Sequence, residues 1–193
     1  MPITLSGDGI TSDNITSLAA SKLTGQVPDA NAPSGSVIQV VQVVKTDPAA
    51  GTIGAVWADI SGMSASITPS SASSKILVIV DIKGSGGAGY SVIRTRLLRN
   101  STPIYVGDAA SNRPQSLGQY YQGSQADNIH YIAQLGGTFL DSPATTSSVT
   151  YKVQVGADGT SQVIFLNRTQ GDRDVTTYDS RVAASITLME IAA

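Results

Sequence analysis

The chain has 193 residues, and its 12 Lys and Arg against 14 Asp and Glu give a formal net charge of −2. This balance excludes a protein that binds nucleic acid through a strongly basic surface. The absence of Cys excludes disulfides and thiolate metal sites, and the single His leaves the usual zinc ligand sets incomplete. No apolar run is long enough to span a membrane, and the first residues lack the pattern of a signal peptide. We therefore expect no nucleic-acid partner, no membrane insertion, no metal and no cofactor.

The polar residues favour β-structure. Ser occurs 25 times, Thr 18 times and Gly 19 times, whereas Glu occurs once, at Glu190. Exposed helix surfaces are normally built from Glu, Lys, Gln and Arg, so this chain has little material for them. Ser, Thr, Val and Ile instead suit pleated surfaces and tight turns. The composition predicts an all-β fold.

Residues 1–35 differ from the rest because they carry few charges and are interrupted by Gly and Pro. Apolar residues recur roughly at helical spacing after the N-cap residues of 11–14, which predicts one short helix, and an extended or disordered tail is the alternative. A helix of about 12 residues is marginal alone, so we expect it to pack on another subunit or a larger partner. The candidate anchoring residues are Ile10, Ile15, Leu18 and Leu23.

From residue 36 onward, short β-type runs are separated by turn residues at the spacing typical of a β-sandwich or barrel. The run 75–83 is almost continuously apolar, which predicts a central strand covered on both faces or lying at a subunit contact. The predicted domains are therefore an N-terminal segment, 1–35, and an antiparallel β-sandwich, 36–193. The predicted strands are 37–44, 56–60, 65–68, 75–83, 90–99, 104–106, 130–135, 138–140, 150–155, 162–166 and 184–191.

Two motifs with catalytic or cofactor associations fail on context. Residues 84–89 match the G-x-G-x-x-G spacing, but no helix pattern follows, so a flexible hairpin connection is favoured over a nucleotide site. His130 allows many Ser-His-Asp combinations on paper, yet no nucleophile motif accompanies it, and a packed side chain is favoured over a base. We expect no catalytic residues.

An acidic segment, 167–179, brings Asp172, Asp174 and Asp179 near one another in the sequence. A calcium loop or the carboxylate pair of a glycosidase would use such residues, but neither spacing is met. Arg168 and Arg173 are ordinary ion-pair partners for these carboxylates. We therefore expect a solvated loop or a set of salt bridges at a subunit edge.

The stretch 113–128 is the longest part of residues 36–193 without strand signals, and long loops in compact domains are often functional. Tyr offers a flat apolar body and a hydroxyl group, which suits recognition surfaces. A plain connecting loop is the default interpretation, and receptor contacts in this stretch are the functional hypothesis. The candidate receptor-binding residues are Gln119, Tyr120, Tyr121 and Gln122.

Several segments of the sequence resemble segments of one protein family. These are residues 33–41, 64–78, 140–146 with 151–154, and 184–191. They are similar to a C-terminal module of bacteriophage tail fibres and other virion surface proteins. The resemblance covers about residues 36–193, and residues 15–28 resemble the threading segments that precede such modules. It includes no catalytic signature. The family implies a jelly-roll β-sandwich that forms a homotrimer, with an N-terminal portion that fixes it to other virion proteins of the tail or capsid.

The resemblance leads us to expect a non-enzymatic virion protein, assembled in the host cytoplasm, that acts as a tail fibre or tip in host attachment and binds host surface carbohydrate. The module begins only about 35 residues after Met1, so almost no shaft precedes it. A capsid decoration protein, such as a head fibre anchored through residues 1–35, is therefore the alternative. A polysaccharide depolymerase is a third hypothesis, with the three aspartates of 167–179 as its crowded carboxylates.

Overall fold

The structure, a computed structural model, describes residues 32–54, 57–87, 91–123, 129–157 and 162–193. In these residues the chain forms β-strands and no α-helix, so the described part contains no helix that could cross a membrane. The strands are β1 (Val37–Lys45), β2 (Ala49–Ile53), β3 (Ala58–Ile67), β4 (Lys75–Asp81), β5 (Lys83–Gly86), β6 (Ser91–Arg99), β7 (Thr102–Ile104), β8 (Gly118–Gln122), β9 (Ala133–Gln134), β10 (Gly137–Asp141), β11 (Val149–Gly156), β12 (Gln162–Leu166) and β13 (Ala184–Ile191). The predicted all-β fold is confirmed.

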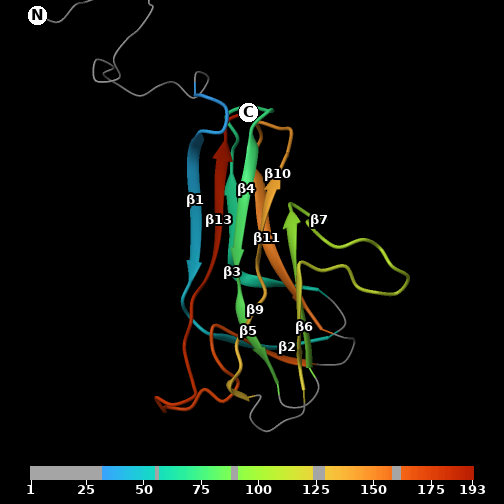
Figure 1. Cartoon of the computed structure of the whole chain (residues 1–193), viewed down its shortest axis with the longest axis vertical. Coiled ribbons are helices and arrows are strands. Elements are labelled where there is room, and N and C mark those ends of the chain that lie inside the picture. The colour runs from blue at the N-terminus through green and yellow to red at the C-terminus, as the bar shows by residue number, and fades with distance from the viewer. Residues whose placement is uncertain (1–31, 55–56, 88–90, 124–128, 158–161) are drawn as a thin grey trace, which may run out of the picture.

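One layer of the sandwich is a long sheet in two parts, which Figure 1 shows one above the other. The upper part has the strand order β1-β13-β4-β10, and the lower part has the order β2-β12-β5-β9. Each lower strand precedes or follows the upper strand that holds the same place in the order. The four pairs therefore act as four long strands that bend midway, and all their pairings are antiparallel.

The second layer has the order β3-β11-β6-β7, and β8 also pairs with β6. When each bent pair counts as one long strand, and β7 and β8, which pair with successive parts of β6, also count as one, the first sheet contains the first, eighth, third and sixth strands of the chain. The second sheet contains the second, seventh, fourth and fifth. This order is that of a jelly roll, in which two Greek keys fold against each other. The jelly-roll fold implied by the resemblance is confirmed.

Alternation along the central strands builds the core between the two layers. Ile76, Val78 and Val80 of β4 are buried, whereas Leu77 and Ile79 point to the other side of the sheet and are half-buried. The same period of two places Val149, Tyr151, Val153 and Val155 of β11 inside. The prediction that 75–83 contains a central strand is confirmed, because β4 lies between β13 and β10.

A buried polar link joins the two layers. The Tyr151 hydroxyl donates to Asp141 Oδ2 at 2.6 Å, and Arg99 Nη1 donates to Asp141 Oδ1 at 2.9 Å. Asp141 ends β10 of the first layer, whereas Arg99 and Tyr151 belong to β6 and β11 of the second. Burial, followed by the hydrogen bond to Asp141, raises the pKa of Tyr151 far above its ordinary value, so the hydroxyl remains a donor.

Three described strands lie where the sequence predicted turns or loops. β2 and β5 are rich in Ala and Gly, and β8 consists of Gly, Gln and Tyr. All three pair with a neighbouring strand that is itself strongly β-forming, β12 or β6. The two strands predicted at 56–60 and 65–68 are instead one strand, β3, which passes through Gly62 at a φ of 79° and is irregularly paired there.

The glycines of the G-x-G-x-x-G stretch serve close packing. Gly84 and Gly86 lie in β5, so this part is a strand and not the predicted flexible connection. A Cβ atom at Gly86 would lie 2.8 Å from the Cβ of Ser91, and one at Gly84 would lie 2.9 Å from the carbonyl oxygen of Phe165. The missing side chains let β5 approach its neighbours.

Candidate functional site

The predicted receptor-binding residues lie on β8, an edge strand, and not in a loop as the sequence predicted. Strand alternation divides them between two faces. Gln119 and Tyr121 point outward, and Tyr121 is 53% exposed. Tyr120 packs against the core, and its burial raises the pKa of its hydroxyl. A receptor role for Gln119 and Tyr121 stays a prediction.

Gln122 is a structural residue here, which corrects the prediction for it. Its side chain is buried, and its Oε1 accepts a hydrogen bond from the Gly86 amide at 2.8 Å. Its Nε2 donates to Gln170 Oε1 at 3.0 Å and to the Gly87 carbonyl at 3.3 Å. Gln122 thus connects β8 to β5 and to the segment that follows β12, and it presents no polar atom to a receptor.

The candidate anchoring residues Ile10, Ile15, Leu18 and Leu23 lie outside the described residues. The described chain starts at Ala32, beside the C-terminus. Gly35 donates its amide hydrogen to the Ala192 carbonyl at 2.8 Å, and the Ala192 amide donates to the Ser36 carbonyl at 2.9 Å. The point where residues 1–31 join the sandwich is therefore fixed at the end marked C in Figure 1. We call this end of the molecule the entry end.

Glu190, the sole glutamate, lies between the two layers at the entry end. The sequence did not identify it as a site residue. It points inward from β13 and is fully buried. Gln39 Nε2 donates to its Oε2 at 2.5 Å, while the Ser70 amide and hydroxyl donate to its Oε1 at 2.7 Å and 2.6 Å. Burial raises the pKa of this carboxyl, but the hydrogen bonds outweigh burial and leave the pKa below its ordinary value.

The outer face of the upper sheet is unusually apolar for a surface. One row crosses all four strands in register, through Val40, Met189, Leu77 and Leu140. Val40 is 56% exposed and Leu140 is 46% exposed. Antiparallel sheets that face water normally carry polar residues on that side. We call this row and the next one the outer apolar face.

The second row of the outer apolar face is Gln42, Thr187, Ile79 and Thr138. The two rows contain no charged residue, because Lys75 and Asp81 stand beyond them at opposite ends of β4. The first row is apolar throughout, and Ile79 extends it into the otherwise uncharged polar second row. A contiguous apolar strip of this kind is typical of a protein interface.

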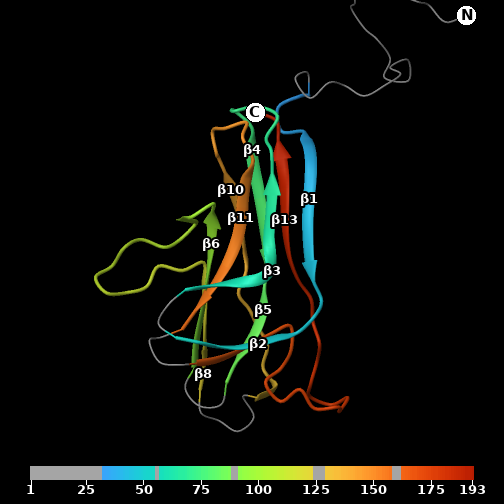
Figure 2. The same cartoon turned by 180° about the vertical axis from the view of Figure 1, so that it is seen from behind.

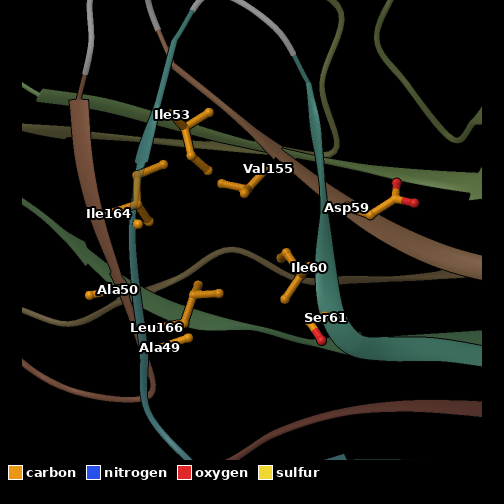
Figure 3. A pocket seen from close by; sticks show the side chains of 10 residues that line it. Ala49, Ala50, Ile53, Asp59, Ile60, Ser61, Val155, Ile164 and Leu166 are labelled. Carbon is orange, nitrogen blue, oxygen red and sulfur yellow. The ribbon is translucent and has the colours of Figure 1, made fainter.

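A small apolar crevice opens between the lower sheet and the second layer, and Figure 3 shows its side chains converging. Its volume is about 140 Å³, and the converging residues include Ile53, Ile60, Val155 and Ile164. Asp59 at its rim accepts hydrogen bonds from Lys152 and Gln154. These hydrogen bonds, with that from Lys152 the larger effect, lower the pKa of Asp59. Among the described residues that line the crevice, Asp59 is the one titratable group.

The acidic segment forms a loop between β12 and β13, at the opposite end of the molecule from the entry end (Figures 1 and 2). We call residues 168–181 the distal loop, because Arg168 and Arg181 form a β-bridge at its base. Asp179, whose side chain is 4% exposed, lies at its centre. It accepts hydrogen bonds from the Thr169 hydroxyl at 2.8 Å and from Arg173 Nε at 2.8 Å.

His130 also reaches the distal loop, a contact that sequence did not predict. Its Nδ1 lies 3.4 Å from Asp179 Oδ1, and its ring stacks on Tyr178 with centroids 4.9 Å apart. The hydrogen bond from Arg173 is the largest of the effects that hold the pKa of Asp179 well below its usual range. A glycosidase acid needs a raised pKa, so Asp179 does not suit that role.

The ion pairs predicted for Arg168 and Arg173 are confirmed, and Arg181 forms a further pair that sequence did not predict. Arg168 Nη1 lies 3.2 Å from Asp172 Oδ2, Arg181 Nη2 lies 2.7 Å from Asp172 Oδ1, and Arg173 pairs with Asp179. Across the described ranges, no group of three or more His, Asp or Glu side chains is placed to hold a metal ion.

No family model and no curated protein matches this sequence. Solved structures of infectious bursal disease virus particles share a general likeness to the fold. Its T=1 particles match with 8% identity and a TM-score of 0.41 over 88% of this chain and 44% of that chain. Its T13 viral particle matches with 11% identity and a TM-score of 0.39 over 88% and 43%. This chain spans less than half of the length of either, and the likeness concerns the general course of the β-sandwich alone.

Proposed function

We propose that this chain is a non-enzymatic structural protein of a bacteriophage virion, a trimeric fibre-type protein on the particle surface that takes part in host attachment. Residues 36–193 form the domain exposed on the particle surface, and residues 1–35 fix this domain to other virion proteins. The sequence resemblance supports the class of protein. The outer apolar face is the observation that supports trimer assembly. An uncharged face of this kind packs best against a similar surface, and a second copy of this chain supplies one.

A threefold axis parallel to the strands of the upper sheet fits this surface. Such an axis brings three copies of each row to the same height, so Leu77 and Met189 of one copy meet apolar residues of the next. The rows bring no like charges together, because Lys75 and Asp81 lie beyond them. The same axis places all three copies of Ala32 at one end, from which three N-terminal segments can reach a single attachment point.

Light scattering coupled to size exclusion tests the trimer on the full-length protein and on residues 36–193. We expect a trimer mass for both. Leu77→Lys places a charge in the outer apolar face and should give a folded monomer, because Leu77 points away from the core. Val175→Lys is the matched control, since Val175 is 43% exposed on the distal loop. A monomeric wild-type protein would contradict the proposal. A trimeric Leu77→Lys protein would show that the subunit interface does not include the outer apolar face.

Antibody labelling of intact particles in electron microscopy tests the location. Label at the tail supports host attachment. Label spread over the capsid of the particle instead supports a capsid decoration protein. In that case, deletion of residues 1–35 should abolish capsid binding while the trimer persists.

A further inference from the structure

The distal loop combines features of a ligand site and lies at the end of the sandwich opposite the entry end (Figure 1). In the proposed orientation this end faces away from the particle. Only that orientation rests on the proposed function, whereas the chemistry of the loop is independent of it. The loop itself lies outside the receptor-binding region that sequence predicted, which is β8.

The base of the distal loop is anchored to the sandwich. Asn167, which is fully buried and has a φ of 59°, donates from Nδ2 to the Lys45 carbonyl at 2.8 Å and the Asp47 carbonyl at 3.2 Å. The Gly171 amide donates to the Ile129 carbonyl at 3.1 Å. A surface loop whose ends are close and whose own side chains pack its interior is a compact Ω-type loop, and such loops are frequently functional.

A hollow lies against this loop, with a volume of about 510 Å³. This volume falls within the range of about 300 to 1,000 Å³ that is typical of small-molecule sites. Asp174, Thr176 and Ser180 line it. Their side chains are exposed and make no hydrogen bond or ion pair within the described residues, so one carboxylate and two hydroxyl groups remain for a ligand.

On the same loop, Tyr178 presents an exposed aromatic ring close to Arg173, one of the residues that line the hollow. It is 60% exposed although its ring stacks on His130, and the Arg173 guanidinium lies 6.0 Å from its ring centroid. Both supporting residues contact Asp179, which is nearly buried. The ring is therefore held by the same network that shapes the loop, and it offers a rigid apolar platform that costs little conformational entropy on binding.

The charges at this site balance. Three arginines face three aspartates: Arg168, Arg173, Arg181, Asp172, Asp174 and Asp179. A polyanion gains little from such a site, whereas a ligand with many hydroxyl groups finds both carboxylate acceptors and guanidinium donors in fixed geometry. The apolar face of a sugar ring can stack on Tyr178 while its hydroxyl groups meet Asp174 and the arginines.

We propose that the distal loop is a binding site for a neutral saccharide, with Tyr178 as the stacking platform and Asp174 as a hydroxyl acceptor. The test uses the full-length protein on an array that carries neutral hexose and N-acetylhexosamine oligosaccharides together with oligosaccharides that contain uronic or sialic acid. Titration calorimetry of the strongest neutral binder then gives an affinity. We expect Tyr178→Ala to weaken binding about tenfold and Asp174→Asn about fivefold.

Tyr121→Ala is the matched control, since it removes a similarly exposed tyrosine from β8. Unchanged affinity in this variant supports the distal loop. Loss of binding in Tyr121→Ala with full binding in Tyr178→Ala overturns the proposal and assigns the ligand to β8. Binding to acidic oligosaccharides alone, or to none, also overturns it. None of these outcomes affects the trimer mass or the particle location, so the proposed function fails or stands separately.

Discussion

The entry end and the distal loop are each organised around a single buried carboxylate, and the two carboxylates are held differently. Glu190 receives hydrogen bonds from an amide, a hydroxyl and a backbone group, none of them charged. Asp179 receives hydrogen bonds from a hydroxyl group and from a cation, Arg173. Glu190 is a buried charge without a counterion among the described residues, whereas Asp179 is part of an ion-pair network.

The donors also differ in where they lie in the chain. Those of Glu190 come from β1 and from the turn between β3 and β4, so its contacts tie together segments of the sandwich itself. Those of Asp179 come chiefly from the distal loop, with His130 added from outside it. Loss of the first contact set should therefore lower global stability, whereas loss of the second should open a local unit.

The largest expected effect is that of Glu190→Ala. It removes one of the two acceptors of the Gln39 side-chain amide and the acceptor of both Ser70 donors in a partly buried place, and it adds a cavity. We expect the free energy of unfolding to fall by about 3 kcal/mol. Urea denaturation at one fixed protein concentration measures it, because subunit association shifts apparent stability.

Glu190→Gln and Val175→Ala complete that experiment. The first keeps one acceptor oxygen and should cost about half as much as Glu190→Ala. The second shortens an exposed side chain of the distal loop, outside the proposed interface, and should change stability by about 0.5 kcal/mol or less. A Glu190→Ala protein as stable as Val175→Ala would show that the entry end is not held by this carboxylate.

The role of Glu190 could have been found from sequence. Ile186, Leu188 and Glu190 share one face of the predicted last strand, so a lone carboxylate in phase with buried positions signals a buried acceptor. Asp179 gives no such signal. Its contact with His130 joins residues far apart in the chain, and it exists only because the distal loop folds back over the end of the sandwich.

The same contrast separates the strands that could be predicted from those that could not. β4 and β13 are rich in Val, Ile and Leu, and their own side chains favour a pleated surface. β8 has no such residues and forms because Gly118–Gln122 lies beside β6. Its strand conformation depends on tertiary pairing, which is why the candidate receptor residues were placed in a loop.

Asp179→Asn should have a smaller and more local effect. Asn places a donor against Arg173 and loses the charge that holds the distal loop. We expect the thermal midpoint to change little, while hydrogen exchange measured by mass spectrometry speeds up in peptides from residues 168–181. Asp174→Asn is the control, because Asp174 has no side-chain partner among the described residues. A midpoint that falls as far as in Glu190→Ala would contradict the local character of this network.

The smallest expected effect is the acid dependence, which distinguishes the two carboxylates within one protein. Both have a pKa below the ordinary value, so each stabilises the fold above its unfolded pKa and loses that contribution as the pH falls. Glu190 begins to lose it below its ordinary pKa of 4.5, and Asp179 only below 3.8. The thermal midpoint of wild type should therefore fall more steeply than that of Glu190→Gln between about pH 4.5 and 3.8, where Asp179→Asn should keep the wild-type slope, and Asp179→Asn should have a shallower slope than wild type only below about pH 3.8. Parallel slopes in wild type and Glu190→Gln would mean that the Glu190 carboxyl titrates alike in the folded and unfolded chain, and its hydrogen bonds would then not hold it in the ionised form.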